Sequence, residues 1–480
     1  MGQSSARLNR KPLRARGRSR MKKGVLSLLC ATPITCNTAP PPGRVFYVST
    51  DGSNSNPGTR EQPWATPGYG SRQLAPGDTL IILGGRYSLS AYDEDIIMPG
   101  SGAPNAWITI RGESGNRPVL AGSDNLAAAI DISGKSYIRI ENLEITSEHG
   151  EWFREGINAT GGPLNHAIFK DLYIHHMDEF GIDIGDAEDL QILNCRITYC
   201  GFGSIGGPAG ERGGWRNVII RDCELSWSGH YYQGGDGPGP YDRPDGFGIE
   251  PSDGPIEIAN TNSEHNRGDG LDSKAKNTYI HECVIANNSC DGLKLWGSGS
   301  RAVNCLVYGR GDGDPSPTPW SAIVIAAEDG GNFQLINITV DDSVGENYLM
   351  HVQYDYPNVP VKLTVRNAIF SGRGPNSPIF VGEATDLSLE YCLFYMPRSG
   401  RVLEWGSHSY DSSQVGNIGP GNRYGDPRFT SAGFGSDGNY HLLNGSPGID
   451  AGTPAGAPGI DLDGATRPKG GGYDMGAYER

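Results

Sequence analysis

The stretch GDGLDSKAKNTYIHECVIANNSCDGLKLW (268–296) contains the tripeptide Asp-Gly-Leu twice, at Asp269 and Asp291, which lie 22 residues apart. An interval of this size is typical of stacked structural repeats. The segment after the tripeptide also recurs: a polar residue, a small or apolar residue, any residue and an apolar residue. This pattern begins, with one degenerate copy at 260, at Asn142, Asp171, Asn194, Asp222, Asn260, Glu282, Asn304, Asn337, Asn367 and Tyr391.

The length of the repeat decides the fold class. Successive copies are separated by 22 to 38 residues, so the basic unit has 22 and the longer intervals hold insertions. Such a unit is too short for two helices and two turns, but it fits three short strands and three corners, which is one coil of a parallel β-helix. The 71 glycines suit a chain that bends at every corner. We therefore predict an all-β chain, a right-handed parallel β-helix of about ten coils, with an N-terminal cap and a C-terminal closing segment.

The cysteines follow the same repeat. Five of the 9 cysteines occupy the second position of the pattern, at Cys195, Cys223, Cys283, Cys305 and Cys392. Equivalent positions of stacked coils lie above one another, so we expect an inward column of free thiols. A disulfide framework or a structural zinc site is not expected, because each cysteine lies on its own coil and no Cys-x-x-Cys spacing occurs.

The two ends of the chain differ from the repeat. Residues 21–36, MKKGVLSLLCATPITC, resemble a secretory signal whose apolar run is too short, and is interrupted by Pro33, to span a bilayer. The segments at 46–67 and 446–454 resemble the opening and closing segments of secreted bacterial β-helix proteins. We predict a leader at 1–43, a β-helix domain with its cap at 44–440 and a closing segment at 441–480. The expected protein is a monomer, secreted or on the bacterial cell surface, without a transmembrane segment.

The net charge limits the partners. The chain has 55 Asp and Glu against 40 Lys and Arg, so nucleic acid is not expected as a ligand. An anionic polysaccharide would also be repelled unless a bound cation or local basic groups reverse the field at its site.

Three successive coils carry the candidate site. Aligned at Asp-Gly, they read DGFGIE, DGLDSK and DGLKLW. If Phe247, Leu271 and Leu293 point inward, alternation places the next residues outward. We expect one corner column of acids and two outward columns: Asp245, Asp269 and Asp291; Gly248, Asp272 and Lys294; Glu250, Lys274 and Trp296.

Two insertions flank these coils, at 227–244 and 308–321. We expect them to rise as two walls of a groove that binds a polysaccharide. Aromatic rings suit sugar faces, and asparagine amides suit hydroxyl groups. The expected substrate-binding residues are Trp296, Glu250, Tyr231, Tyr232, Trp320, Asn266 and Asn288.

The segments GDGLDSK and NNSCDGLKLW resemble the calcium-site segment of family-nine polysaccharide lyases. The resemblance implies an aspartate cluster that holds Ca²⁺ against a substrate carboxylate, and a lysine that removes the C5 proton before β-elimination. On this basis the metal ligands would be Asp245, Asp269 and Asp291. Cys290 and Lys294 stand where that family has acids, and 322–329, on the next coil, contains no lysine.

These departures favour a second interpretation, in which Lys294 replaces the metal and Lys274 acts as the base, with Asp272 beside them. The expected function is thus a polysaccharide lyase acting on a uronic-acid-containing polysaccharide. Other interpretations stay open. The same residues could form surface ion pairs and turn caps, they could be the paired carboxylates of a β-helix glycoside hydrolase, or they could line a non-catalytic binding or adhesive surface.

Overall fold

The computed structural model of the chain describes residues 43–147, 152–208, 210–309, 321–342, 348–374, 378–433 and 438–480. The predicted leader, almost all of 1–43, lies outside these residues. Three short α-helices occur in the described part: α1 (Pro67–Arg72), α2 (Tyr92–Asp95) and α3 (Val415–Ile418). None of the described helices is long and apolar enough to cross a membrane.

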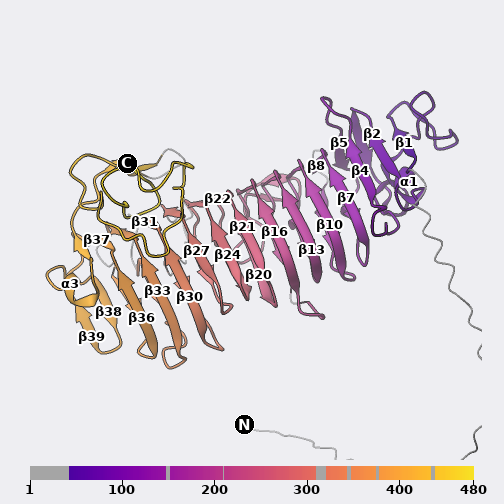
Figure 1. Ribbon diagram of the computed structural model, residues 1–480. Helices are drawn as coiled ribbons and strands as arrows, with labels where there is room; N and C mark the ends of the chain where they lie inside the picture. The colour runs from indigo at the N-terminus through magenta and orange to yellow at the C-terminus, as the bar shows by residue number, and fades with distance from the viewer. Residues whose placement is uncertain are drawn as a thin grey trace, which may run out of the picture. The chain divides into compact units, whose positions relative to one another are not determined.

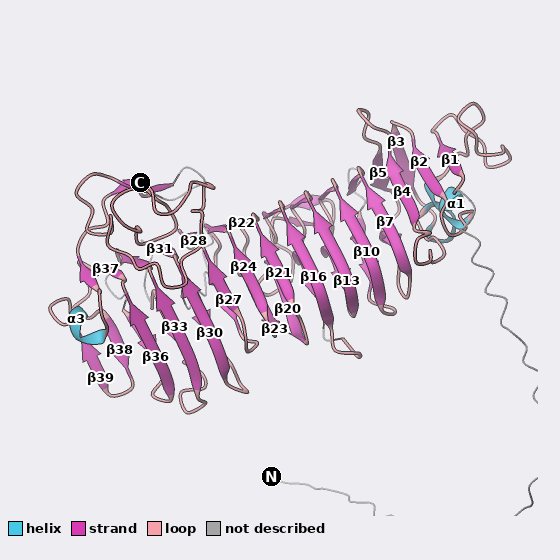
Figure 2. Ribbon diagram, in the orientation of Figure 1, coloured by secondary structure: helices cyan, strands magenta, loops and turns pink. Residues whose placement is uncertain are grey.

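Three long sheets run the length of the domain, and successive strands of the chain enter them in turn (Figures 1 and 2). Sheet A has 13 strands, in the order β1 (Val45–Val48), β2 (Thr79–Ile82), β4 (Ile108–Gly112), β7 (Ser136–Glu141), β10 (Leu164–Lys170), β13 (Ala187–Leu193), β16 (Trp215–Arg221), β21 (Ile256–Ala259), β24 (Thr278–His281), β27 (Arg301–Val303), β30 (Gly331–Ile336), β33 (Val361–Arg366) and β36 (Thr385–Glu390).

Sheet B has 13 strands, in the order β3 (Arg86–Leu89), β5 (Val119–Gly122), β8 (Glu144–Ser147), β11 (Tyr173–His175), β14 (Arg196–Thr198), β17 (Glu224–Ser226), β22 (Asn262–Glu264), β25 (Val284–Ala286), β28 (Leu306–Tyr308), β31 (Thr339–Asp342), β34 (Ile369–Gly372), β37 (Leu393–Tyr395) and β40 (Arg423–Tyr424).

Sheet C has 12 strands, in the order β6 (Leu126–Asp131), β9 (Phe153–Ala159), β12 (Phe180–Ile184), β15 (Gly203–Gly207), β20 (Asp245–Ser252), β23 (Leu271–Ala275), β26 (Leu293–Leu295), β29 (Ile323–Ile325), β32 (Met350–Val352), β35 (Ile379–Val381), β38 (Leu403–Trp405) and β39 (His408–Tyr410). Two hairpins stand apart, β18 (Tyr231–Tyr232) with β19 (Gly235–Asp236) and β41 (Phe429–Ser431) with β42 (Asn439–Leu442). Strands within the long sheets pair in parallel, apart from β38 and β39. The predicted right-handed parallel β-helix is confirmed.

The repeated sequence pattern marks one corner of the coil. Its ten copies follow ten strands of sheet A, from β7 to β36, and the first residue of each has φ between 45° and 58°. Asn and Asp tolerate this left-handed conformation better than other side chains. The three earlier strands β1, β2 and β4 are not followed by the pattern, and for this reason the sequence suggests about ten coils where sheet A has 13 strands.

The inside of the cylinder is apolar, and the cysteine column is part of it. All five repeat cysteines are buried and free, as predicted. The thiol of Cys195 donates a hydrogen bond to the carbonyl of Leu193, 3.3 Å away, and that of Cys305 donates likewise to Val303. The thiols therefore act as small core side chains that also satisfy carbonyl groups at the corner.

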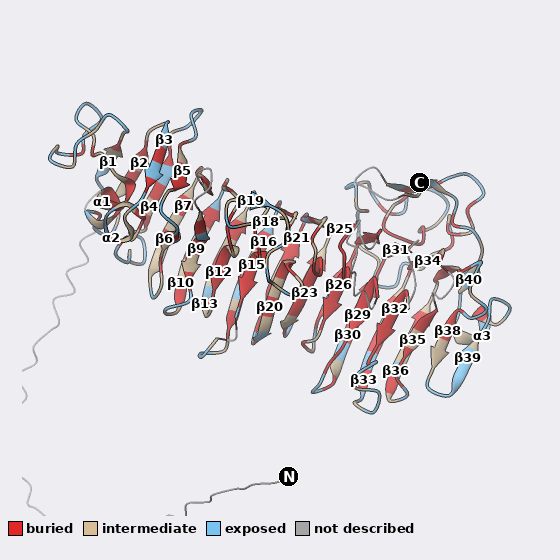
Figure 3. Ribbon diagram, turned by 180° about the vertical axis from the view of Figure 1, so that it is seen from behind, coloured by how far each residue is buried: buried red, intermediate tan, exposed pale blue. Residues whose placement is uncertain are grey.

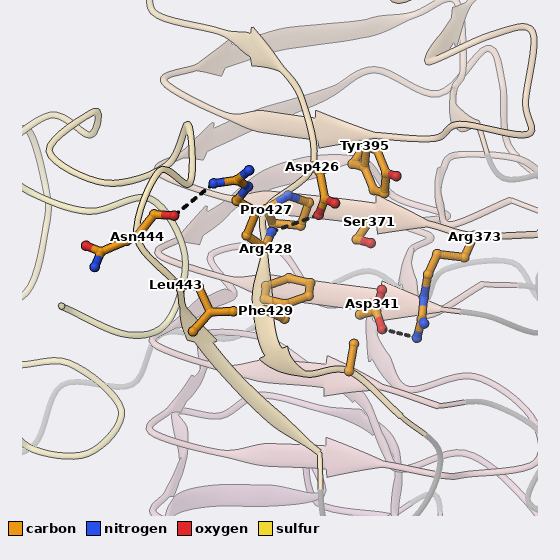
Figure 4. Close-up of a pocket in the computed structure, with 11 residues that line it drawn as sticks. Asp341, Ser371, Arg373, Tyr395, Asp426, Pro427, Arg428, Phe429, Leu443 and Asn444 are labelled. Atoms are coloured by element: carbon orange, nitrogen blue, oxygen red, sulfur yellow. Dashed lines mark hydrogen bonds and ion pairs between the residues drawn. The ribbon is translucent and has the colours of Figure 1, made fainter.

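The C-terminal segment folds back along sheet B, so that the C-terminus lies near β31 (Figure 1). The guanidinium of Arg467 is fully buried, pairs with Glu479 at 2.6 Å and donates to Asn304, next to β28, at 3.2 Å. Figure 4 shows the hollow of about 470 Å³ that remains between this segment and the sheet, where Arg373 pairs with Asp341. The segment thus covers the side of several coils.

Candidate active site

Strands β20, β23 and β26 of sheet C adopt the register expected from their Asp-Gly anchors. Leu271 pairs with Phe247 and Leu293, and all three are buried in the core. Asp272 consequently lies between Gly248 and Lys294 on the outer face. The predicted outward column of Gly248, Asp272 and Lys294 is confirmed.

Most residues of these strands are buried on both faces of the sheet. All three residues of β26 are buried, although the middle one, Lys294, points outward. Figure 3, drawn from behind the view of Figure 1, shows β23 and β26 mainly in the colour of buried residues. The outward side chains of Asp272 and Lys294 are therefore largely shielded from solvent, which gives their surroundings a low local dielectric constant.

The corner aspartates form a ladder along the coils. Asp245 Oδ1 accepts a hydrogen bond from the backbone N–H of Asp269 at 2.7 Å, and Asp269 Oδ1 accepts one from Asp291 at 2.8 Å. Asp291 Oδ1 in turn accepts one from Ser321 at 2.8 Å. One oxygen of each carboxylate thus caps the next turn, as Asp before Gly commonly does.

Lys294 reaches into the middle of this ladder. Its ammonium group lies 2.8 Å from Asp269 Oδ2, 3.3 Å from Asp291 Oδ2 and 3.7 Å from Asp272 Oδ2. The side chain is only 3% exposed. The attraction of the three carboxylates outweighs the effect of burial and raises the pKa of Lys294. Lys294 is therefore a buried cation, not the exposed member of a surface ion pair.

Burial acts in the opposite direction on the acids. It raises the pKa of Asp272 to about 7, although the charge of Lys294 lowers it. Burial also raises the pKa of Asp245 and Asp269, and in each case a neighbouring carboxylate adds to the effect. Trp296 donates its indole N–H to Asp272 Oδ1 at 2.8 Å, which holds this carboxyl in place.

The remaining outward residues lie beside this cluster. Lys274 donates a hydrogen bond to Glu250 Oε1, and its ammonium lies 5.9 Å from the centre of the Trp296 ring. Lys274 thus forms an ion pair with Glu250 at the edge of the cluster. Lys274 remains 28% exposed and can offer its charge to a ligand.

The residues do not fit a calcium ion. Asp245, Asp269 and Asp272 bring carboxylate oxygens within 4.8 Å of one another. However, both oxygens of Asp269 already accept hydrogen bonds, one from a backbone N–H and one from Lys294. Asp291 uses its oxygens in the same way. The ammonium of Lys294 occupies the centre of the cluster, where it would repel a metal ion, and Ca²⁺ needs six to eight oxygen ligands.

The structure places the other predicted site residues differently. Asn266 and Asn288 are buried within the cylinder, where Asn266 donates to Asn288 Oδ1 at 2.9 Å, so they do not face a ligand. Tyr231 is 5% exposed and packs on the edge of the His176 ring. Tyr232 is half-buried and contacts Tyr241 in the wall at 227–244. Trp320 lies outside the described residues, as does most of the wall at 308–321.

A groove of about 690 Å³ joins these features. It contains Asp245, Asp269, Asp272, Lys274, Lys294 and Trp296, and it continues along sheet C to residues that the sequence did not suggest. Those are Phe180 and Asp183 on β12, Phe202 before β15, and Arg243 in the wall. The insertion of 227–244 breaks the 22-residue interval between β15 and β20, so the Asp-Gly alignment could not be carried back to them.

Comparisons with known proteins agree with this fold. Residues 46–200 match the family model described as Pel9A-like, right handed beta helix region. An uncharacterised protein of Bacillus subtilis, YwoF, is 30% identical over 145 residues, which cover 28% of this chain and 29% of the relative. The chain thus matches less than a third of the length of that relative.

Two solved structures share the architecture at low sequence identity. The complex of XylC with xylose is 11% identical, with 90% of this chain and 98% of that one covered and a TM-score of 0.50. The A-module of the mannuronan C-5 epimerase AlgE4 from Azotobacter vinelandii is 12% identical, covers 69% of this chain and 90% of that one, and has a TM-score of 0.51. The aspartate cluster lies beyond the region matched by the family model. Residues 46–200 thus resemble the Pel9A-like right-handed β-helix region, and the described chain as a whole folds as a right-handed parallel β-helix.

Proposed function

We propose that this protein is a polysaccharide lyase that cleaves a uronic-acid-containing polysaccharide by β-elimination in the groove on sheet C. The observation that carries the proposal is the position of Asp272. Its carboxyl has a pKa of about 7, lines the groove and lies next to the ammonium groups of Lys294 and Lys274. A proton acceptor works best when its pKa is near the working pH.

The residues of the groove can divide the reaction between them. Ionised Asp272 would accept the proton from C5 of the uronic acid, while Lys274 pairs with the carboxylate of the sugar in place of Glu250. The bond between C4 and the leaving oxygen then breaks, and a double bond forms between C4 and C5. Asp245 has a raised pKa and would donate a proton to the leaving oxygen. Lys294 would stay within the cluster and compensate the charge of Asp269 and Asp291.

The Pel9A-like region at 46–200 and the likeness of 268–296 to the calcium-site segment of family-nine lyases support this reaction class. The charge of the groove does not oppose it, because burial raises the pKa of Asp245 and raises that of Asp272 to about 7, and two lysines face the same space. A uronic acid would thus meet less negative charge than the number of acids suggests.

Incubation with polygalacturonate and alginate tests the proposal. The unsaturated product absorbs in the ultraviolet, and a reducing-end assay counts every cleavage. We expect both signals to rise together for the wild-type protein and to disappear for Asp272→Asn. The matched control is Asp189→Asn, which makes the same charge change on β13 of sheet A, outside the groove. Cleavage without absorbance would refute elimination.

One observation favours a second candidate, glycoside hydrolysis. Carboxylate oxygens of Asp245 and Asp272 lie within 4.8 Å of one another, and retaining glycosidases hold their two carboxyl groups about 5 Å apart. New reducing ends without ultraviolet absorbance would support this candidate. Binding without either signal would support a non-catalytic polysaccharide-binding protein.

A further inference from the structure

The part of the groove around Asp183 has no role in the reaction described above. Asp183 lies on β12 and is 8% exposed, yet its Oδ1 has no hydrogen-bond partner among the described residues. Buried carboxylate oxygens normally have partners, because an unpaired one is costly. Asp183 lines the groove, so a ligand in the groove can supply the missing donor.

Asp183 and Asp272 belong to the same outward column of sheet C. Asp183 pairs with Gly206, Gly206 with Gly248, and Gly248 with Asp272. Three coils thus separate the two acids, which corresponds to about 14 Å at the usual spacing of neighbouring strands. Gly206 and Gly248 add no side chain to the floor between the two acids, which we call the trough, but the ring of Phe180 and the carboxylate of Asp245 lie over it.

The absence of a side chain at these two positions has a structural reason. A Cβ atom on Gly206 would lie 2.5 Å from the ring of Phe180, and one on Gly248 would lie 2.8 Å from Asp245 Oδ2. The glycines therefore allow an aromatic ring and a carboxylate to lie over the floor of the trough. A chain of sugars bound at Asp272 can continue over these two side chains, which line the groove, toward Asp183.

Aromatic rings stand next to Asp183. The ring centres of Phe180 and Phe202 are 4.7 Å apart, and Phe202 stacks on Tyr241 of the wall, also at 4.7 Å. Phe180 and Phe202 line the groove. An apolar face beside an unpaired acceptor is the combination that a sugar ring needs, since its C–H face packs on aromatic rings and its hydroxyl groups donate to oxygen.

The charge around Asp183 differs from that around Asp272. Burial is the main cause that raises the pKa of Asp183 to about 6, and the negative charge of Glu179 adds to it. Arg154 is paired with Glu179 at 2.9 Å. Lysine is absent from the described residues that line this end of the groove, although Arg243 of the wall lines it as well. A carboxylate of the substrate would be repelled by Asp183, whereas a neutral sugar would not.

We infer that Asp183, Phe180 and Phe202 form a binding subsite for a neutral sugar residue, three coils away from the uronic acid at Asp272. The position of the uronic acid at Asp272 rests on the proposed function. Together the two sites specify the substrate as a polysaccharide that contains both neutral and uronic sugars. Asp183 is a positioning and specificity residue, since it touches the substrate far from the reacting bond.

Binding without turnover tests the subsite. Retention is measured in native gels, with all variants made in the Asp272→Asn background. One gel contains rhamnogalacturonan, in which neutral and uronic sugars alternate, and the other contains polygalacturonate, in which every sugar is charged. We expect Asp183→Leu to weaken retention by rhamnogalacturonan roughly tenfold, because a hydrogen bond to the carboxylate and its charge are lost. Asp183→Asn, which keeps the shape and one acceptor, should weaken it less and should strengthen retention by polygalacturonate.

Asp189→Asn in the same background serves as the control and should change neither retention, and thermal unfolding checks that each variant is folded. Equal changes with both polymers, no change with either, or no retention of the parent protein by rhamnogalacturonan would overturn the inference. If the predicted split between the polymers appears but the wild-type protein releases no unsaturated product, the lyase proposal fails and the neutral subsite stands.

Discussion

The ammonium group of Lys294 lies 2.8 Å from Asp269 Oδ2, on the preceding coil, and both side chains are at least 97% buried. Asp291, on the same coil as Lys294, and Asp272, on the same coil as Asp269, approach the same ammonium. Two neighbouring coils of the β-helix are thus joined by one cation, in the segment that resembles the calcium-site segment of family-nine polysaccharide lyases. Several measurable properties depend on this arrangement.

Removal of the cation should destabilise the protein. In Lys294→Met the buried carboxylates lose their counter-charge, so we expect the free energy of unfolding to fall by roughly 3–5 kcal/mol, as when one partner of a buried ion pair is removed. Urea denaturation at pH 7 measures the change. The matched control is Lys362→Met, which removes an exposed pair with Asp386 and should cost less than about 1 kcal/mol. Equal effects of the two substitutions would contradict the buried-cation assignment.

Calcium should have no effect on the wild-type protein. We expect neither chelation nor added Ca²⁺ to shift the midpoint of thermal unfolding, because Lys294 occupies the centre of the acidic cluster. Lys294→Asp would replace the ammonium with another carboxylate and should gain a calcium-dependent rise of the midpoint. A rise for the wild-type protein and none for the variant would show that the metal binds independently of Lys294.

The pH dependence follows from Asp272. Its pKa of about 7 in the folded protein lies above the ordinary value of 3.8, so the native state holds this proton more tightly than the unfolded chain does. The carboxyl therefore makes the native state progressively less stable as the pH rises from about 4 to about 7. Thermal unfolding of the wild type and of Asp272→Asn across this range should show the difference, with the variant relatively more stable at pH 8.

Activity should change with pH in the opposite sense. The proposed base is the ionised form of Asp272, so the rate of product formation should rise through a pH of about 7. A rate that falls over this range would instead require the protonated carboxyl and would favour its use as an acid. Initial rates between pH 5 and 9 distinguish the two.

Gly248 should be essential for binding, because it keeps the floor of the groove open. In Gly248→Val the added atoms would meet Asp245 Oδ2 and would stand between Asp272 and the trough. We expect retention by polysaccharide gels to be lost while the unfolding midpoint changes by only a few degrees. Gly416→Val is the control, since a Cβ atom at Gly416 would meet nothing within 4 Å. Unchanged retention by Gly248→Val would place the ligand elsewhere.

The fold could be predicted from the sequence because its corners have a strong residue preference. Residues such as Asn194 and Asn304 adopt positive φ at the same corner of successive coils, and the residue after each is buried. The first coils lack this corner and were not recognised by the pattern. Between Asp269 and Asp291 the interval is 22 residues, so aligning the two Asp-Gly pairs also predicted the register of β23 against β26. The neighbouring positions of Asp272 and Lys294 could be predicted for this reason.

The depth of the site could not be predicted. Alternation places Lys294 outward, which suggests exposure, but the carboxylates gathered around its ammonium group leave only 3% of its side chain exposed. Asn266 and Asn288 precede the Asp-Gly anchors at the same distance, yet their amides bond to each other inside the corner. Asp183 lay outside the Asp-Gly alignment, because the insertion at 227–244 interrupts the 22-residue interval before β20.

The C-terminal segment has a consequence for the order of folding. Contacts between neighbouring coils join residues 22 to 38 positions apart, such as those between Asp269 and Asp291, whereas Arg467 meets Asn304 across 163 positions and Asn337 meets Gly476 across 139. Local contacts form early and distant ones late, because long loops must close first. Neighbouring coils can therefore assemble one upon another first, and residues 441–480 can make their contacts only after the coils that they cover have formed. A chain truncated before Arg467 would keep its groove but would leave one side of β28 and β31 without this cover.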